Sequence, residues 1–176
     1  MNKRSTKLWS LWGFAAVSLG GTLLHFLYDL FDRSVLIAPF SGVNESTWEH
    51  MKLLFFPMFI FAVIQSLFFK DRTDFFCVKL RGILIGQLLI PVIFYTYNGT
   101  FGKSPDFVNI AIFFISAAAA YFYEARKFEK NDLEGCSQIL SLLIMIFIAV
   151  LFVLFTFCPP KLPIFCDPVT GMYGIE

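Results

Sequence analysis

The chain has 176 residues, of which 57% are hydrophobic, 19% aromatic and only 15% charged. Soluble domains average about 25% charged residues, so this composition excludes an ordinary soluble domain. The formal net charge is +1, and no basic stripe runs along the sequence, which argues against nucleic acid as a partner. The charges form short clusters between long apolar stretches, which predicts an integral membrane protein surrounded by the lipid bilayer.

Five apolar stretches are long enough to cross a hydrocarbon core of about 30 Å, which takes roughly 20 helical residues. Short connections join them, and no linker rich in Pro, Gly or Ser divides the chain. The sequence therefore predicts an all-α bundle of five transmembrane helices in one domain, residues 1–176. The expected spans are 8–31, 48–69, 77–98, 107–125 and 139–157, followed by a tail of residues 158–176.

The basic residues predict the orientation of these spans. Ten of the fourteen Lys and Arg residues lie in the N-terminal segment, the second loop or the fourth loop, and such segments usually face the cytoplasm. We therefore expect a cytoplasmic N-terminus and an extracytoplasmic C-terminus. The first apolar stretch is longer than a signal-peptide core and ends in no good cleavage site, so we expect it to be retained.

The four cysteines divide between the two predicted sides of the membrane. Cys77 and Cys136 lie at expected cytoplasmic ends, where thiols stay reduced. Cys158 and Cys166 lie in the expected external tail, and in an oxidising compartment they can form a disulfide. Spacing alone does not establish the geometry that a disulfide needs. Two unpaired thiols in the tail are therefore the alternative.

Polar residues recur along one face of the first expected helix. Their spacing of three or four residues places them on a common face, and two adjacent glycines allow close packing in lipid. The face should therefore point into the bundle, either as a functional site or as a set of hydrogen bonds between helices. Its members are Ser18, Thr22, His25, Asp29 and Asp32, beside Gly20 and Gly21.

The stretch GVNESTWEHMKLLFF, residues 42–56, places four ionisable side chains at the start of the second span. Ser46 and Glu49 match the S-x-x-E capping box, which explains both as parts of a helix start. Glu45, His50 and Lys52 have no such explanation, and they are expected on the same side of the membrane as His25.

The third expected helix adds polar residues toward the same side. Pro91 cannot donate a hydrogen bond to the carbonyl of Gln87, and a freed carbonyl at membrane depth must face protein or a cavity. Together the three helices predict a pocket on the external side. Its candidate ligand-binding residues are His25, Asp29, Glu45, Glu49, His50, Lys52, Tyr95 and Asn98.

Three segments of the chain carry distinctive patterns: LLHFLYDLF, VNESTWEHMKLLFFP and FCDPVTGMYGI. With them the chain resembles a family of small bacterial multi-pass membrane proteins, a domain of unknown function with a PxNESxWEHxK-like signature. Gly42 stands where a proline often precedes the valine of that signature. The resemblance covers nearly the whole chain and implies no established activity. It does imply a multi-pass protein of the cytoplasmic membrane of a bacterium, and it implies that the tail belongs to the folded unit.

Three hypotheses about function follow from these residues. The polar cluster can be a structural lock or a partner site in a non-enzymatic protein, which can act as a homodimer or with another membrane protein. It can bind or transport a small anionic ligand or lipid headgroup, using His50, Lys52 and the helix N-terminus. It can also be the zinc site of a metal-dependent hydrolase with a bound water as nucleophile. The ligands would be His25 and His50 with one or two of Asp29, Glu45 and Glu49, although Lys52 nearby would repel the cation.

Overall fold

The computed structural model describes residues 3–130 and 135–175. Five long helices follow one another along the chain, and each is long and apolar enough to cross a membrane. They are α1 (Lys3–Leu30), α2 (Thr47–Ser66), α3 (Phe75–Phe101), α4 (Asp106–Lys130) and α5 (Gln138–Phe157), followed by the short 3₁₀ helix η1 (Pro163–Phe165). The prediction of an all-helical chain with five such helices is confirmed for the described residues.

The helix ends differ from the expected spans for a simple reason. α1 begins at Lys3 rather than residue 8, and α4 continues to Lys130 rather than ending at residue 125. Hydropathy finds the part of a helix that can lie in lipid, whereas the hydrogen-bonded helix continues through charged turns beyond it. α2 is shorter than expected and ends at Ser66, because residues 67 and 68 form a turn.

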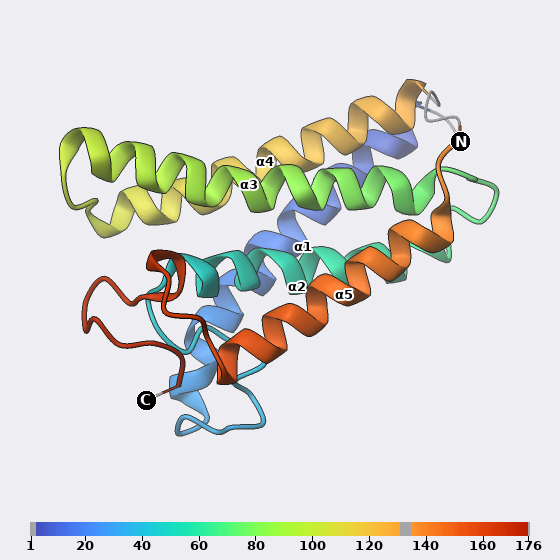
Figure 1. Cartoon of the computed structure of the whole chain (residues 1–176). Coiled ribbons are helices and arrows are strands. Elements are labelled where there is room, and N and C mark those ends of the chain that lie inside the picture. The colour runs from blue at the N-terminus through green and yellow to red at the C-terminus, as the bar shows by residue number, and fades with distance from the viewer. Residues whose placement is uncertain (1–2, 131–134, 176) are drawn as a thin grey trace.

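The five helices form a bundle in which α2 contacts all four other helices. α3 and α4 run side by side as a long hairpin, and α1 crosses between α4 and α2 (Figure 1). α5 lies mainly against α3 and has a smaller interface with α2. We name the two ends of the bundle by features described below. The disulfide end holds the start of α1, the α2–α3 connection and residues 135–137; the tail end holds residues 31–46, the α3–α4 turn and residues 158–175.

The apolar core lies around the middle of α2. This helix buries residues on every side, whereas α1, α4 and α5 each expose many large apolar side chains on their outer faces. Those exposed faces suit contact with lipid. The core includes Val17 of α1, Leu54, Phe55 and Met58 of α2, Ile83 of α3, Ala117 and Ala120 of α4, and Met145 and Phe152 of α5.

Glycines in α1 let this helix approach α2 and α4 closely. A Cβ atom on Gly21 would lie 3.0 Å from the carbonyl oxygen of Leu53 and would clash with the ring of Phe113. Because helices in lipid associate through close packing of small residues, Gly21 is a site where α1 is held against both neighbours.

We expect Gly21→Ala to lower the free energy of unfolding by about 1–3 kcal/mol, the usual cost of overpacking a well-packed site. Thermal unfolding of the detergent-solubilised protein measures it. Gly99→Ala is the matched control, because nothing lies within 4 Å of a Cβ atom there, and its melting temperature should be unchanged or slightly higher. Equal melting temperatures for the two variants would contradict the close approach of α1.

Candidate functional site

Lys52 forms a buried junction at the tail end of the bundle. Its side chain is fully buried, and its ammonium group lies 2.5 Å from the Oε2 atom of Glu49. It also donates to the carbonyl oxygen of Ala38 at 2.9 Å and to the hydroxyl of Thr156 at 2.8 Å. An ammonium group has three hydrogens to donate, and all three have partners. We call Lys52, Glu49, Ala38 and Thr156 the Lys52 junction.

The carboxylate of Glu49 has a second task within this junction. Its Oε2 atom also accepts a hydrogen bond of 3.1 Å from the backbone N–H of Val43. The Ser46 side chain is the N-cap of α2 and accepts from the backbone N–H of Glu49 at 3.4 Å. In a full capping box Glu49 would bond to the N–H of Ser46, but that N–H donates to the side chain of Asn44 instead. Glu49 is therefore turned inward, toward Lys52.

The segment between α1 and α2 folds back onto the end of α1. The Ser41 hydroxyl donates to the carbonyl oxygen of Leu24 at 2.5 Å and accepts from the backbone N–H of Tyr28 at 2.8 Å. Gly42 donates to the same Leu24 oxygen. These bonds hold Ala38 in place for Lys52 and bring the following residues, from Val43 onward, close to the end of α1.

The tail packs against the start of α2 and the end of α5. The Trp48 ring lies 4.5 Å from the Phe152 ring and 4.7 Å from the Phe165 ring, between centroids. The Asn44 side chain donates to the carbonyl oxygen of Gly174 at 2.9 Å. The tail is thus part of the folded unit, lying against the start of α2 (Figure 1).

Three of the expected site residues come together beside this junction. The Glu45 carboxylate lies between two imidazoles, 3.8 Å from Nε2 of His25 and 3.5 Å from Nε2 of His50. The two imidazole centroids are 5.8 Å apart. All three side chains are partly open to solvent. We call them the His–Glu–His cluster.

The tautomer of His50 follows from its other nitrogen. Nδ1 lies 3.0 Å from the carbonyl oxygen of Ser46, and a carbonyl only accepts, so Nδ1 carries the hydrogen. A neutral His50 therefore points a lone pair from Nε2 toward Glu45, whose ionised carboxylate also only accepts. The cluster consequently needs a proton or another hydrogen-bond donor between these atoms.

A small cavity of about 20 Å³ adjoins the cluster. This volume is large enough for one water molecule. Glu45, Thr47 and His50 line one side, and apolar residues of α3 and α4 line the rest together with Asn109. Asn109 is a residue that the sequence did not point to; it is held by a 2.7 Å hydrogen bond between its Oδ1 atom and the Ser104 hydroxyl.

The other expected site residues lie elsewhere. Asp29 is exposed and pairs with Arg33 at 3.3 Å. Tyr95 is 41% exposed on α3, and Asn98 organises the α3–α4 turn through bonds to Phe94 and Ser104.

These placements separate the metal ligands that the sequence suggested. Asp29 and Glu49 each bind a basic side chain, which leaves His25 and His50 without either of them. In residues 3–130 and 135–175, no group of three or more His, Cys, Asp and Glu side chains is arranged to hold a metal ion.

A second buried ion pair, which was not among the residues expected from the sequence, lies toward the disulfide end. Lys79 of α3 and Glu124 of α4 are 2.6 Å apart, and each side chain is only 1% exposed. Lys79 also lies over the rings of Phe61 and Tyr121, 5.4 and 5.1 Å from their centroids. A Cβ atom on Gly82 would lie 2.6 Å from Oε1 of Glu124, so this glycine makes room for the pair.

Two sequence features could have revealed this pair. Glu124 lies inside the expected span 107–125, where an acidic residue usually has a partner within the protein. The ten basic residues counted above include Lys79 with the second loop, but Lys79 lies in the second turn of α3 and is buried. It therefore does not count among the loop charges that set orientation.

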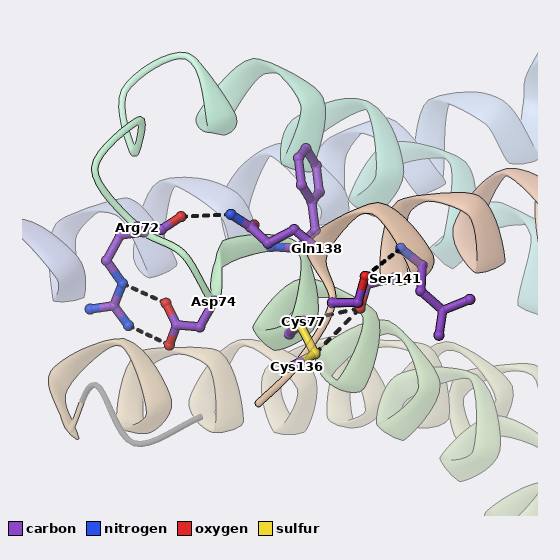
Figure 2. The surroundings of a disulfide bond; sticks show 9 residues. Arg72, Asp74, Cys77, Cys136, Gln138 and Ser141 are labelled. Atoms are coloured by element: carbon purple, nitrogen blue, oxygen red, sulfur yellow. Dashed lines mark hydrogen bonds and ion pairs between the residues drawn. A yellow bond between two sulfur atoms is a disulfide. The ribbon is translucent and has the colours of Figure 1, made fainter. Parts of the chain in front are cut away.

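The disulfide pairing differs from the one expected. Cys77 and Cys136 are bonded to each other, whereas Cys158 and Cys166 are free. The expectation of reduced thiols at positions 77 and 136 and a bonded pair in the tail is therefore wrong for this structure. The start of α5 lies against the start of α3 and so brings Cys136 to Cys77 (Figure 2). In the tail, Cys158 is exposed at the end of α5 and Cys166 pairs with Tyr173 in a backbone bridge.

Polar contacts surround this disulfide (Figure 2). The Gln138 side chain donates to the carbonyl oxygen of Arg72 at 2.8 Å and accepts from the backbone N–H of Phe76 at 2.9 Å. Arg72 forms two bonds to the carboxylate of Asp74 and a third to the carbonyl oxygen of Phe128. The start of α5 is thus joined to the α2–α3 connection, and that connection to α4.

The Lys52 junction should control stability. Lys52→Met leaves the Glu49 carboxylate buried without its cation, so we expect a loss of about 3–5 kcal/mol in the free energy of unfolding. The double variant Glu49→Gln/Lys52→Met removes both charges and should recover part of that loss. Arg33→Gln breaks an exposed pair and serves as the control, with an expected loss of about 0–1 kcal/mol. Denaturation in detergent measures all three; similar losses for Lys52→Met and Arg33→Gln would contradict a buried junction.

Comparison with known proteins gives a family and no activity. Residues 1–175 match the family described as "Family of unknown function (DUF6512)". No curated protein and no solved structure matches the chain. The matched residues include both ion pairs, the His–Glu–His cluster and the tail. The chain therefore belongs to this family of unknown function.

Proposed function

We propose that this chain is a non-enzymatic binding protein of a bacterial cytoplasmic membrane, with its N-terminus in the cytoplasm and its tail end outside. The Lys52 junction holds the tail end together, and the His–Glu–His cluster beside it binds a small ligand that carries a positive charge or hydrogen-bond donors. The structural lock and the ligand site were alternative roles for one polar cluster in the sequence. The proposal keeps both roles and separates them: the lock is the Lys52 junction, and the ligand site is the His–Glu–His cluster.

The convergence of three acceptors is the observation that supports such a ligand. Oε2 of Glu45 lies 3.5 Å from Nε2 of His50, and Oε1 of Glu45 lies 3.8 Å from Nε2 of His25. The three acceptors are the two carboxylate oxygens and Nε2 of a neutral His50. Among the described residues no Lys or Arg is paired with Glu45; its partners are the two imidazoles, which are charged only when protonated. Beside neutral imidazoles the carboxylate attracts a cation. An ammonium group fits this arrangement because it only donates.

An anionic ligand is less well supported than the sequence suggested. That hypothesis relied on Lys52 as an accessible positive charge, but Lys52 is fully buried and bonded to Glu49, Ala38 and Thr156. The side chain of Glu45 is 48% exposed at the same place, and its negative charge would repel an anion.

The proposed orientation is supported by the basic residues that remain once the buried ones are set aside. Lys52 and Lys79 are neutralised inside the bundle, so neither weighs on the choice. The remaining positive charges still gather at the disulfide end, which supports a cytoplasmic position for that end. By their place in the sequence they are Lys3, Arg4, Lys7, Lys70, Arg72, Arg81, Arg126, Lys127 and Lys130, against Arg33, Lys103 and Lys161 at the tail end.

Ligand class can be tested by thermal shift, since a ligand that binds the folded protein raises its melting temperature. We expect ethanolamine to raise the melting temperature of the purified protein and inorganic phosphate at equal ionic strength to leave it unchanged. Glu45→Gln should abolish the ethanolamine effect. Arg33→Gln, a change to an exposed pair outside the cluster, should preserve it.

Three results would overturn the binding proposal. A rise with phosphate alone would restore the anionic hypothesis. Stoichiometric zinc binding that His50→Gln removes would establish a metal centre instead. If no probe raises the melting temperature of the parent protein, and His25→Gln and His50→Gln merely lower it, the cluster is an internal ion pair.

A further inference from the structure

We propose that the Cys77–Cys136 disulfide is a reversible clamp on α5, opened by cytoplasmic dithiols through exchange at Cys136. The proposal rests on the orientation stated under Proposed function and is independent of the ligand assigned to the tail end.

The clamp lies where stable structural disulfides are uncommon. It joins the third residue of α3 to the connection that precedes α5, across a sequence separation of 59 residues. In the proposed orientation this end faces the cytoplasm, where thiols are kept reduced and the disulfides that do form are usually transient, catalytic or redox-sensing. Its position therefore suggests a bond that opens and closes.

The two sulfur atoms differ in access. Cys136 is partly exposed in the α4–α5 connection, whereas Cys77 is 1% exposed within α3. An incoming thiolate therefore reaches Sγ of Cys136 first, which makes Cys77 the leaving group. Figure 2 shows the pair beside the start of α5, with Ser141 next to it.

The surroundings of Cys77 favour its departure as a thiolate. The Ser141 hydroxyl lies 3.4 Å from Sγ of Cys77 and 3.6 Å from Sγ of Cys136. A disulfide sulfur carries no hydrogen, so Ser141 is the donor toward it. Cys77 also lies in the first turn of α3, where the partial positive charge of the helix N-terminus stabilises a thiolate.

The exchange balances with a dithiol as the reductant. One thiolate of the dithiol attacks Sγ of Cys136; a mixed disulfide forms, the Cys77–Cys136 bond breaks, and its electron pair goes to Sγ of Cys77, which then takes a proton. The second thiol of the reductant attacks its own sulfur in the mixed disulfide and releases Cys136 as a thiolate, which is protonated in turn. The dithiol leaves as a disulfide, and the protein gains two electrons and two protons.

Opening the clamp should loosen the start of α5. After reduction, the start of α5 keeps the two Gln138 hydrogen bonds to the α2–α3 connection and the start of α3. Farther along, α5 lies mainly against α3, and an open apolar groove of about 610 Å³ lies between parts of α2 and α5. Its lining includes Phe56 and Phe59 of α2 and Ile146, Val150 and Leu154 of α5. The disulfide therefore restrains the start of α5, whereas the contacts with α3 and the Lys52–Thr156 hydrogen bond hold the rest of the helix.

The test uses a chain in which this pair holds the only cysteines, the Cys158→Ser/Cys166→Ser variant in the full-length protein. In growing bacterial cells quenched with acid and labelled with a maleimide-polyethylene glycol after denaturation, we expect most of the pair to be reduced. Diamide should convert it to the unlabelled disulfide, and removal of diamide should reverse this within minutes. A third substitution, Cys136→Ser, is the matched control: it leaves one thiol that should be labelled under all conditions.

A second measurement reports the effect on α5. Hydrogen exchange of amides in the first two turns of α5 should be several-fold faster in the reduced protein than in the oxidised one, because local opening becomes easier. The amides of α4 near Phe128 serve as the internal control and should change little. Equal exchange in the two redox states would overturn the clamp.

A reporter fused after Glu176 distinguishes failure of the clamp from failure of the orientation. Alkaline phosphatase activity is expected there, because that enzyme needs an oxidising compartment for its disulfides. If the reporter is active and the pair still remains oxidised in growing cells, or remains reduced under diamide, the clamp proposal is wrong. If the reporter is inactive and the pair is constantly oxidised, the orientation is wrong and the bond is a structural disulfide of an external face.

Discussion

The tail end of this bundle depends on one buried ammonium group. Lys52 has no exposed surface, and its three hydrogens go to α2, to the α1–α2 segment and to α5. A buried charge without partners costs several kcal/mol even after the protein relaxes. The three segments are therefore held where they satisfy Lys52. Glu45 lies just before α2, so the geometry of the His–Glu–His cluster is set by a residue that is not part of it.

Buried ion pairs also help to explain how five apolar helices select their neighbours. In lipid, an apolar helix face gains little from exchanging lipid for another apolar face, so polar contacts and close packing must discriminate. The Glu49–Lys52 pair ties the start of α2 to the end of α5 through Thr156, and the Lys79–Glu124 pair joins α3 to α4. Between the two pairs the core is apolar. Each end of the bundle thus has its own polar contact, and Gly21 and Gly82 provide the space that close approach requires.

The polar residues of the site were easier to predict from the sequence than their partners. His25, Glu45 and His50 were expected in one pocket, and these three side chains do meet. Lys52 was expected in the same open pocket, because a charge at a helix start is normally solvated. Only the path of residues 31–46 shows that Ala38 and Val43 return to cover that position. The predicted cysteine pairing was wrong for the same reason. Spacing shows only which thiols are near in sequence, whereas the packing of α5 on α3 brings Cys136 to Cys77.

The sequence by itself determined the all-helical fold class and the number of helices long enough to cross a membrane. It also determined the helix start at Ser46 and the residues that carry polar groups into the bundle. These are local properties, since apolar length and capping depend on residues adjacent in the chain. The tertiary structure decided which polar side chains are consumed as internal partners and which remain accessible. That division depends on segments far apart in sequence, such as Lys52 and Thr156 or Lys79 and Glu124. Burial turns such side chains into structural partners, because a charge removed from water must be satisfied within the protein.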